Sequence, residues 1–215
     1  MTLRERYNGI IRYFTVNMPV AETELKYRDP FGLMVSVILS AQCTDKRVNM
    51  ITPALLERFP DAEKMAAAEP SEIFEFIKSC SYPNSNAKHL SGMAKMLIAE
   101  FEGEVPSDPE LLQRLPGVGR KTANVVASVV FRKPVMPVDT HVFRVAARIG
   151  LTRNTRKPLD AELQLTKNIP SELIHRAHHW LILHGRYICK AKKPLCDSCG
   201  ISKFCKFYNK VQKKK

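Results

Sequence analysis

The sequence lacks the marks of several protein classes. Its longest apolar run is about ten residues around Phe31–Leu39, half of what crosses a bilayer. No hydrophobic segment follows Met1, which argues against a secretory signal peptide. No alternating apolar runs flanked by Asn-Gly or Gly-Gly turns indicate strands, and internal repeats are absent. With 45% hydrophobic and 26% charged residues, the chain is predicted to be globular, soluble and intracellular, which excludes a disordered tail, a coiled coil and a collagen-like chain.

Acidic residues are scarce relative to basic ones. The chain has 34 Lys and Arg against 21 Asp and Glu, a formal net charge of +13 and a pI near 9.6. From Arg186 to Lys215 there are ten basic residues and one acidic residue, a local charge of +9. An excess of this size predicts a polyanionic partner.

Helical periodicity is frequent, so the sequence predicts an all-α protein of about nine or ten short helices. The stretch Asn124–Phe131 is rich in valine and could be a buried strand by propensity, but its place after a tight hairpin favours a helix. Pro134–Pro137 is a candidate crossing between domains. Helices are expected over 87–101, after a cap at Ser71, from Pro109, over 139–150, and from Pro170 to about His184 with Gly185 as the stop.

Six cysteines are present without an export signal, which points to metal or redox chemistry rather than disulfides. Four of them have the spacing C-x6-C-x2-C-x5-C and can wrap one tetrahedral centre. Zinc and a [4Fe–4S] cluster are the candidates, and the single C-x2-C knuckle favours the cluster; unliganded cysteines are a third possibility. Cys43 and Cys80 are interpreted as buried small hydrophobes. The four clustered residues are Cys189, Cys196, Cys199 and Cys205.

A lysine-rich loop lies between the first two of these cysteines. It carries Lys190, Lys192 and Lys193. A loop closed by a metal centre is a plausible phosphate contact, whereas the alternative is an ordinary solvated lysine run.

A short glycine-containing turn, Leu115–Gly119, separates two expected helices. Gly117 and Gly119 allow positive φ and a close approach by another backbone. The N–H groups that begin the next helix then face outward, which suits a nucleic-acid phosphate. The alternative is an ordinary interhelical turn.

Two residues near helix starts are candidates for chemistry. The positive helix end, with Arg120 beside it, disfavours the ammonium form of Lys121, so this lysine could form a Schiff base; the alternative is phosphate binding. Asp139 could stabilise positive charge on a substrate, or it could simply cap the helix that follows. We interpret the four histidines between residues 175 and 184 as packing or hydrogen-bonding residues, because no H-E-x-x-H pattern is present.

Together these motifs resemble the endonuclease III family, the helix-hairpin-helix DNA glycosylases with abasic-site lyase activity. The likeness runs from about Glu24 to Cys205. The motifs that carry it are Leu39-Ser40-Ala41-Gln42-Cys43-Thr44-Asp45, Leu115-Pro116-Gly117-Val118-Gly119-Arg120-Lys121-Thr122-Ala123, Val138-Asp139-Thr140-His141, His179-Trp180-Leu181-Ile182-Leu183-His184-Gly185-Arg186 and the four cysteines.

The resemblance implies a two-domain all-α fold. A six-helix domain with the helix-hairpin-helix would span 25–133, and an iron–sulfur domain would combine 1–24 with 134–215. The protein would act as a monomer in the cytoplasm or nucleoid, without a membrane. It would remove oxidised pyrimidines from duplex DNA during base excision repair and flip the damaged nucleotide out of the stack.

The resemblance also implies a role for each site residue. Lys121 would attack C1′ and cut the strand 3′ to the lesion by β-elimination, with Asp139 stabilising the sugar's positive charge. The backbone N–H groups of residues 117–119 would hold a phosphate, and Gln42 would fill the gap left by the flipped base. A [4Fe–4S] cluster on the four cysteines would be structural. Further DNA contacts would be Tyr82, Gly117, Val118, Gly119, Arg120, His141, Lys190, Lys192 and Lys193.

One segment departs from the family pattern. Tyr82 stands where family members commonly carry a leucine that wedges into the duplex, and an aromatic wedge resembles the adenine-glycosylase branch. That branch lacks the catalytic lysine, which this chain keeps. Two alternatives therefore accompany the lyase hypothesis: a monofunctional adenine or mismatch glycosylase, and a non-catalytic iron–sulfur DNA-binding protein.

Overall fold

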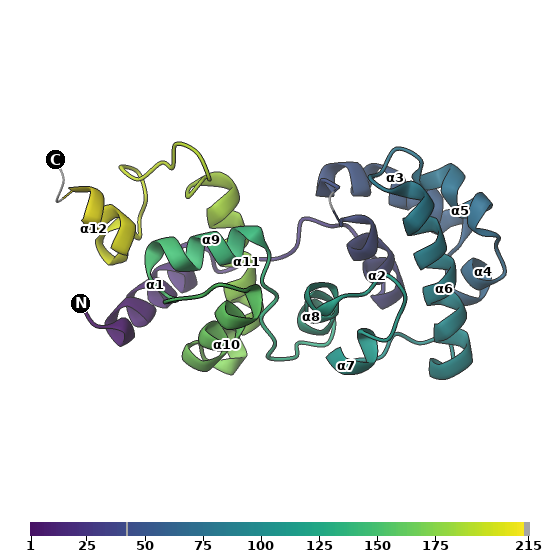
Figure 1. Cartoon of the computed structure of the whole chain (residues 1–215), viewed down its shortest axis with the longest axis horizontal. Coiled ribbons are helices and arrows are strands. Elements are labelled where there is room, and N and C mark those ends of the chain that lie inside the picture. Colours follow the sequence, from purple (N-terminus) through teal and green to yellow (C-terminus); the bar gives the residue numbers. More distant parts are fainter. Residues whose placement is uncertain (42, 213–215) are drawn as a thin grey trace. The chain divides into compact units, whose positions relative to one another are not determined.

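The computed structural model describes residues 1–41 and 43–212, and every regular element in these ranges is helical (Figure 1). The all-α expectation is therefore confirmed. None of the described helices is long and apolar enough to span a membrane. The elements are α1 Leu3–Asn17, α2 Pro30–Leu39, α3 Asp45–Arg58, α4 Ala62–Ala66, α5 Pro70–Ile77, α6 Pro83–Phe101, α7 Pro109–Leu112, α8 Arg120–Val129, α9 Thr140–Ile149, α10 Pro158–Asn168, η1 Ser171–Leu173, α11 Ile174–Tyr187, η2 Ser202–Phe204 and α12 Lys206–Gln212.

The chain divides into two compact units. Unit 1 comprises Met1–Glu22 and Pro134–Lys215, and unit 2 comprises Thr23–Lys133. The helix α1 thus belongs with the C-terminal half of the sequence, while α2 to α8 form the other unit.

Unit 2 is built around α2. Every residue of this helix from Phe31 to Leu39 is buried, and the helix packs against α3, α6 and α8. A helix that is apolar all round requires such a central position. The Asp29 side chain begins it by accepting a hydrogen bond from the Gly32 N–H at 2.7 Å. The longest apolar run of the sequence is thus a core helix.

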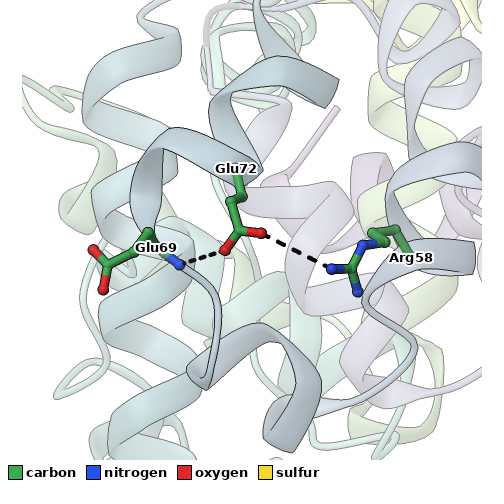
Figure 2. A network of polar contacts seen from close by, with 3 residues as sticks. All are labelled: Arg58, Glu69 and Glu72. Atoms are coloured by element: carbon green, nitrogen blue, oxygen red, sulfur yellow. Dashed lines mark hydrogen bonds and ion pairs between the residues drawn. The ribbon is translucent and has the colours of Figure 1, made fainter.

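The start of α5 differs from the expectation (Figure 2). The residue that precedes the helix is Glu69, whose N–H donates to Glu72 Oε2 at 3.0 Å, so Ser71 is not the cap. Pro70 suits the first helical position because it lacks the N–H that would go unpaired there. The other oxygen of Glu72 lies 3.9 Å from Arg58 Nη2 at the end of α3. The same carboxylate therefore closes the first turn of α5 and contacts α3, which packs against it.

Unit 1 has its core where α1 meets α9 and α11. The rings of Phe14 and Trp180 stack with centroids 5.7 Å apart, and the Trp180 indole N–H donates to the Met18 carbonyl at 2.9 Å. Tyr7 donates its hydroxyl to the Leu151 carbonyl at 3.0 Å. Buried aromatic and polar contacts of this kind hold the N-terminal helix to the C-terminal segment.

Two helix ends test the use of glycine as a stop signal. Gly150 ends α9 in the left-handed region at φ 88°, as expected. Gly185 does not end a helix but lies within α11. A Cβ there would lie 3.0 Å from Val145 Cγ2 and 3.1 Å from His141 Cβ, so this glycine lets α9 and α11 approach closely. The predicted stop at Gly185 was wrong for that reason. The helical interpretation of the valine-rich stretch is confirmed as far as Val129, where α8 ends.

Candidate functional site

The hairpin between α7 and α8 is shaped by two glycines that behave differently. Gly117 has φ 79°, and a Cβ there would lie 2.8 Å from His89 Cβ, so only glycine fits. Gly119 has φ −87° and is extended, and the space where its Cβ would project is open for 4 Å. Positive φ is thus used at Gly117 but not at Gly119. An open position without a side chain leaves room for a ligand to approach the backbone of Gly119.

The hairpin also uses one of its own N–H groups. The Val118 N–H donates to the Leu115 carbonyl at 3.0 Å, and Val118 is 6% exposed. Its backbone donor closes the turn, which leaves the glycines on either side as the more suitable donors to an outside anion.

The first turn of α8 has the electrostatics of an anion site. Gly119 provides no side-chain cap, and the turn contains no acidic residue. Arg120 and Lys121 are both exposed there. Because the first N–H groups of a helix lack intrahelical acceptors and carry the positive end of the dipole, this terminus favours a negative ligand.

Asp139 is the N-cap of α9, so the helix-capping role that the sequence suggested for this residue is observed. Its Oδ1 accepts a hydrogen bond from the Val142 N–H at 2.7 Å, and the residue is half-buried. His141 lies in the first turn, with Nδ1 3.3 Å from Arg144 Nη2. The cap fixes the direction of the carboxylate. Lys121 belongs to unit 2 and Asp139 to unit 1.

All four clustered cysteines line one pocket in unit 1, together with His184 and Arg148. Polar hydrogens approach the sulfurs: the Tyr208 N–H donates to Cys205 Sγ at 3.4 Å, and Arg148 Nη1 donates to Cys189 Sγ at 3.6 Å. Within residues 1–41 and 43–212, no three His, Cys, Asp or Glu side chains converge on a single metal-ion position.

The pocket concentrates thiols away from water. Burial raises the pKa of Cys196, Cys199 and Cys205, and in each case neighbouring cysteine thiolates raise it further. The Arg148 guanidinium acts in the opposite direction on Cys196. A buried group of thiols that repel one another as anions is stabilised as thiolates by a cationic metal centre.

Arg148, at the end of α9, organises the lysine loop, and no sequence pattern predicts this role. Its Nη1 donates to the Lys190 carbonyl at 2.7 Å, and its Nη2 donates to the Ala191 carbonyl at 3.2 Å. Lys190, Lys192 and Lys193 are all exposed on the loop. Nothing in the sequence distinguishes Arg148 from other arginines except its place in the last turn of a helix, where a cation suits free carbonyls.

Tyr82 is an exposed aromatic residue on a strained backbone. It precedes α6 with φ 53° and ψ 49°, and its side chain is 63% exposed. The left-handed region is costly for a bulky residue, and such strain often lies at functional sites. Asn86 supports the turn by donating its Nδ2 to the Ser81 carbonyl at 3.0 Å. Gln42, the other expected duplex contact, lies outside the described residues.

The histidines of α11 pack and hydrogen-bond, as interpreted. His178 Nδ1 lies 2.9 Å from the Pro137 carbonyl, and His179 Nδ1 lies 2.9 Å from the His175 carbonyl. His184 is buried edge-on against the Phe14 ring, and burial lowers its pKa to about 4.

Cys80 is buried, as interpreted, whereas Cys43 is only half-buried. Their Sγ atoms lie 3.5 Å apart in unit 2. The two cysteines are far apart in the sequence, and no local pattern could have paired them.

Comparison with known proteins shows that the chain is similar to DNA repair enzymes in sequence and in fold. The model of the HhH-GPD superfamily base excision DNA repair proteins matches residues 35–171. The endonuclease III of Rickettsia felis is 48% identical over 202 residues, which are 94% of this chain and 94% of that protein. A trapped endonuclease III–DNA covalent intermediate matches with a TM-score of 0.92 at 40% identity, covering 99% of this chain and 100% of that one. A thermostable thymine-DNA glycosylase matches with a TM-score of 0.86 at 25% identity, covering 96% and 98%.

Proposed function

The chain belongs to the endonuclease III family of the HhH-GPD superfamily, and on that premise we propose how its residues share the reaction. It is a DNA glycosylase with abasic-site lyase activity that acts on damaged double-stranded DNA in base excision repair. We propose further that oxidised pyrimidines are its substrates and that it works at the nucleoid in the cytoplasm. The likeness to an enzyme trapped as a covalent DNA intermediate carries the proposal, because such an intermediate needs a protein nucleophile.

Lys121 is the nucleophile in this proposal. Its deprotonated Nζ attacks C1′, and the bond from C1′ to the base breaks with its electron pair leaving on the base, which then takes up a proton. The sugar ring opens to give a protonated imine between Nζ and C1′. This cation acidifies the C2′ proton, and loss of that proton expels the 3′ phosphate. The exposed place of Lys121 in the first turn of α8 supports this assignment.

Asp139 is the charged partner. Its carboxylate stabilises the positive charge that develops on the sugar and accepts a proton from the Lys121 ammonium. The hydrogen bond from the Val142 N–H supports the role, since it holds the carboxyl group in one orientation. The proposal requires that Lys121 and Asp139, which come from different units, reach the same nucleotide.

Backbone and basic groups hold the DNA strand. We propose that the Gly117 and Gly119 N–H groups bind a phosphate, with Val118 shaping the turn, since its N–H already has the Leu115 carbonyl as acceptor. Arg120 and His141 would contact the DNA nearby on their own units. Tyr82 would insert into the duplex at the lesion, and Gln42 would fill the gap left by the flipped base.

We propose that Cys189, Cys196, Cys199 and Cys205 hold a [4Fe–4S] cluster. The donor set fits, because four thiols line one pocket and N–H groups point at two of the sulfurs. When bound, the cluster supplies a cationic iron core that compensates the thiolate charges. It would thereby close the loop of Lys190, Lys192 and Lys193, which Arg148 already fixes, against DNA phosphates.

Trapping with sodium borohydride tests the reaction. The reagent reduces the imine to a stable amine, so an abasic or thymine-glycol duplex should become covalently attached to the wild-type protein. Lys121→Ala should form no adduct, whereas Lys95→Ala, an exposed helical lysine of the same unit, should match the wild type.

Three outcomes would contradict the proposal. An undiminished adduct with Lys121→Ala would remove this lysine from the mechanism. Base release without an adduct would identify a monofunctional glycosylase, the alternative that Tyr82 suggests. Full DNA affinity without turnover would identify a non-catalytic DNA-binding protein.

A further inference from the structure

Cys43 and Cys80 form a pair of thiols outside the four-cysteine pocket. Cys43 lies in the connection between α2 and α3, and Cys80 lies in the connection between α5 and α6. Their Sγ atoms are 3.5 Å apart, and both residues belong to unit 2. Neither has a part in the proposed base excision.

We propose that Cys43 and Cys80 form a reversible disulfide that ties these two connections together and weakens binding of the enzyme to its lesion. The effect on binding rests on the proposed function, because it depends on Tyr82 as a contact with the duplex. Formation of the disulfide does not depend on it.

The geometry favours this bond. A disulfide has an S–S distance of about 2.0 Å, so the two sulfurs must approach by roughly 1.5 Å. Rotation of the two side chains brings the sulfurs closer, and whatever part of this movement the packed surroundings do not allow shifts the turns that carry the cysteines. The Cys80 N–H donates to the Ile77 carbonyl at 2.8 Å and the Cys43 N–H donates to the Ser40 carbonyl at 3.2 Å, so both cysteines sit in tight turns.

These turns lead directly into the expected DNA contacts. Tyr82 follows Cys80 by two residues and already occupies the left-handed region. Cys43 directly precedes Thr44, whose side chain caps α3 by accepting from the Arg47 N–H at 3.3 Å. A displacement at the sulfurs therefore acts on the start of α3 and on the strained turn that presents Tyr82.

The two thiols differ in a way that sets the order of the chemistry. Cys43 is half-buried, whereas Cys80 is 6% exposed and burial raises its pKa to about 12. With oxidised glutathione as the oxidant, the Cys43 thiolate attacks one sulfur and expels one glutathione thiolate. Cys80 then loses its proton and attacks Cys43 Sγ, which expels glutathione from the mixed disulfide. The protein is oxidised by two electrons and oxidised glutathione is reduced to two thiols.

Peptide mapping tests the bond itself. The holoprotein, purified without oxygen, is incubated with oxidised glutathione, alkylated and digested with trypsin. Oxidised wild type should yield the peptides 29–46 and 79–88 joined by a disulfide, and dithiothreitol should separate them. Cys43→Ala should give no linked peptide. Absence of the linked peptides from the wild type would overturn the proposal.

Binding tests the consequence. The probe is a duplex with a tetrahydrofuran abasic analogue, which cannot form an imine. Oxidised wild type should bind it at least about tenfold more weakly than reduced wild type, a loss of about 1.4 kcal/mol, because the disulfide would shift the turn that presents Tyr82 to the duplex. Cys43→Ala should bind the duplex with equal affinity before and after treatment with oxidised glutathione. Cys43→Ser, which has a polar side chain, serves as a second variant with the same expected result.

Two controls separate the causes of a result. Visible absorbance of the cluster should stay equal in the wild type and in Cys43→Ala, so that cluster damage cannot imitate the effect. Equal loss of affinity in both proteins, or unchanged affinity in wild type that carries the linked peptides, would refute the switch. Borohydride trapping by the reduced protein tests the proposed function separately.

Discussion

Replacing Asp139 by Asn separates its structural role from its proposed catalytic role. The Asn Oδ1 can accept the hydrogen bond that Asp139 Oδ1 takes from the Val142 N–H at 2.7 Å, and Asn caps helices about as well as Asp. The substitution removes the negative charge at the start of α9, which costs about 0.3–1 kcal/mol. Asp139→Ala removes the hydrogen bond as well, at a further cost of about 1 kcal/mol.

These free energies translate into small shifts of the melting temperature. In a chain of 215 residues, about 1 kcal/mol lowers Tm by about 2–4 °C. We therefore expect Asp139→Asn to lower Tm by about 1–4 °C and Asp139→Ala by about twice as much. Circular dichroism at the helical band measures both values.

Catalysis should respond to the charge and not to the cap. Both variants should form the borohydride-trapped adduct about 10²- to 10⁴-fold more slowly than the wild type in single-turnover reactions, the range for losing a positioned proton acceptor. Binding to the tetrahydrofuran duplex should change far less. If Asp139→Asn traps DNA at the wild-type rate and only Asp139→Ala is slow, the carboxylate is a helix cap and the mechanism loses its proton acceptor.

Three further substitutions test other parts of the molecule. Burial raises the pKa of Tyr7, so the stability that its neutral phenol contributes is present below about pH 10 and is lost as pH rises above that value. Tyr7→Phe should therefore make the free energy of unfolding fall less steeply with alkaline pH. The variant should also lose about 1 kcal/mol of stability at neutral pH, because the Leu151 carbonyl loses the hydrogen bond from Tyr7. Gly117→Ala should destabilise unit 2 by about 1–3 kcal/mol, because φ 79° is strained for alanine and the new Cβ would meet His89; thermal melting measures the loss, and an unchanged Tm would contradict it. A [4Fe–4S] cluster should give about four iron atoms per chain in the wild type, and Cys205→Ser should contain fewer. Wild-type protein that contains zinc instead of iron and sulfide would refute the cluster.

The presence of the helices could be predicted from the sequence more reliably than the residues at which they begin and end. The apolar stripe after Asp139 and the stop at Gly150 are local features, and both are confirmed. Gly185 could not be interpreted locally, since its reason for being glycine is the approach of Val145 from α9. At α5 the expected cap Ser71 was wrong because Pro70 and the carboxylate of Glu72 move the helix start two residues earlier.

The candidate site was predictable where chemistry and spacing coincide along the chain. The four clustered cysteines lie close together in the sequence, so their common pocket could be expected from spacing alone. Arg148 holds the loop after Cys189 from another helix, and the Cys43–Cys80 pair joins two connections that are distant in the sequence. Contacts of that kind arise from the packing of helices, which one sequence does not specify.

The N-termini of α8 and α9 differ in their capping, because a glycine precedes α8 and an aspartate precedes α9. This contrast bears on the reaction. The helix α8 has Gly119 as its N-cap, which offers no side chain to the first N–H groups, so the cap leaves room for an anion there. The helix α9 begins at Asp139, whose own carboxylate satisfies the Val142 N–H. A helix start without a cap attracts a phosphate, whereas a helix start with an acidic cap repels one and presents negative charge to a cation. This contrast supports the proposal that α8 binds the phosphate backbone and that Asp139 at α9 stabilises the cationic sugar.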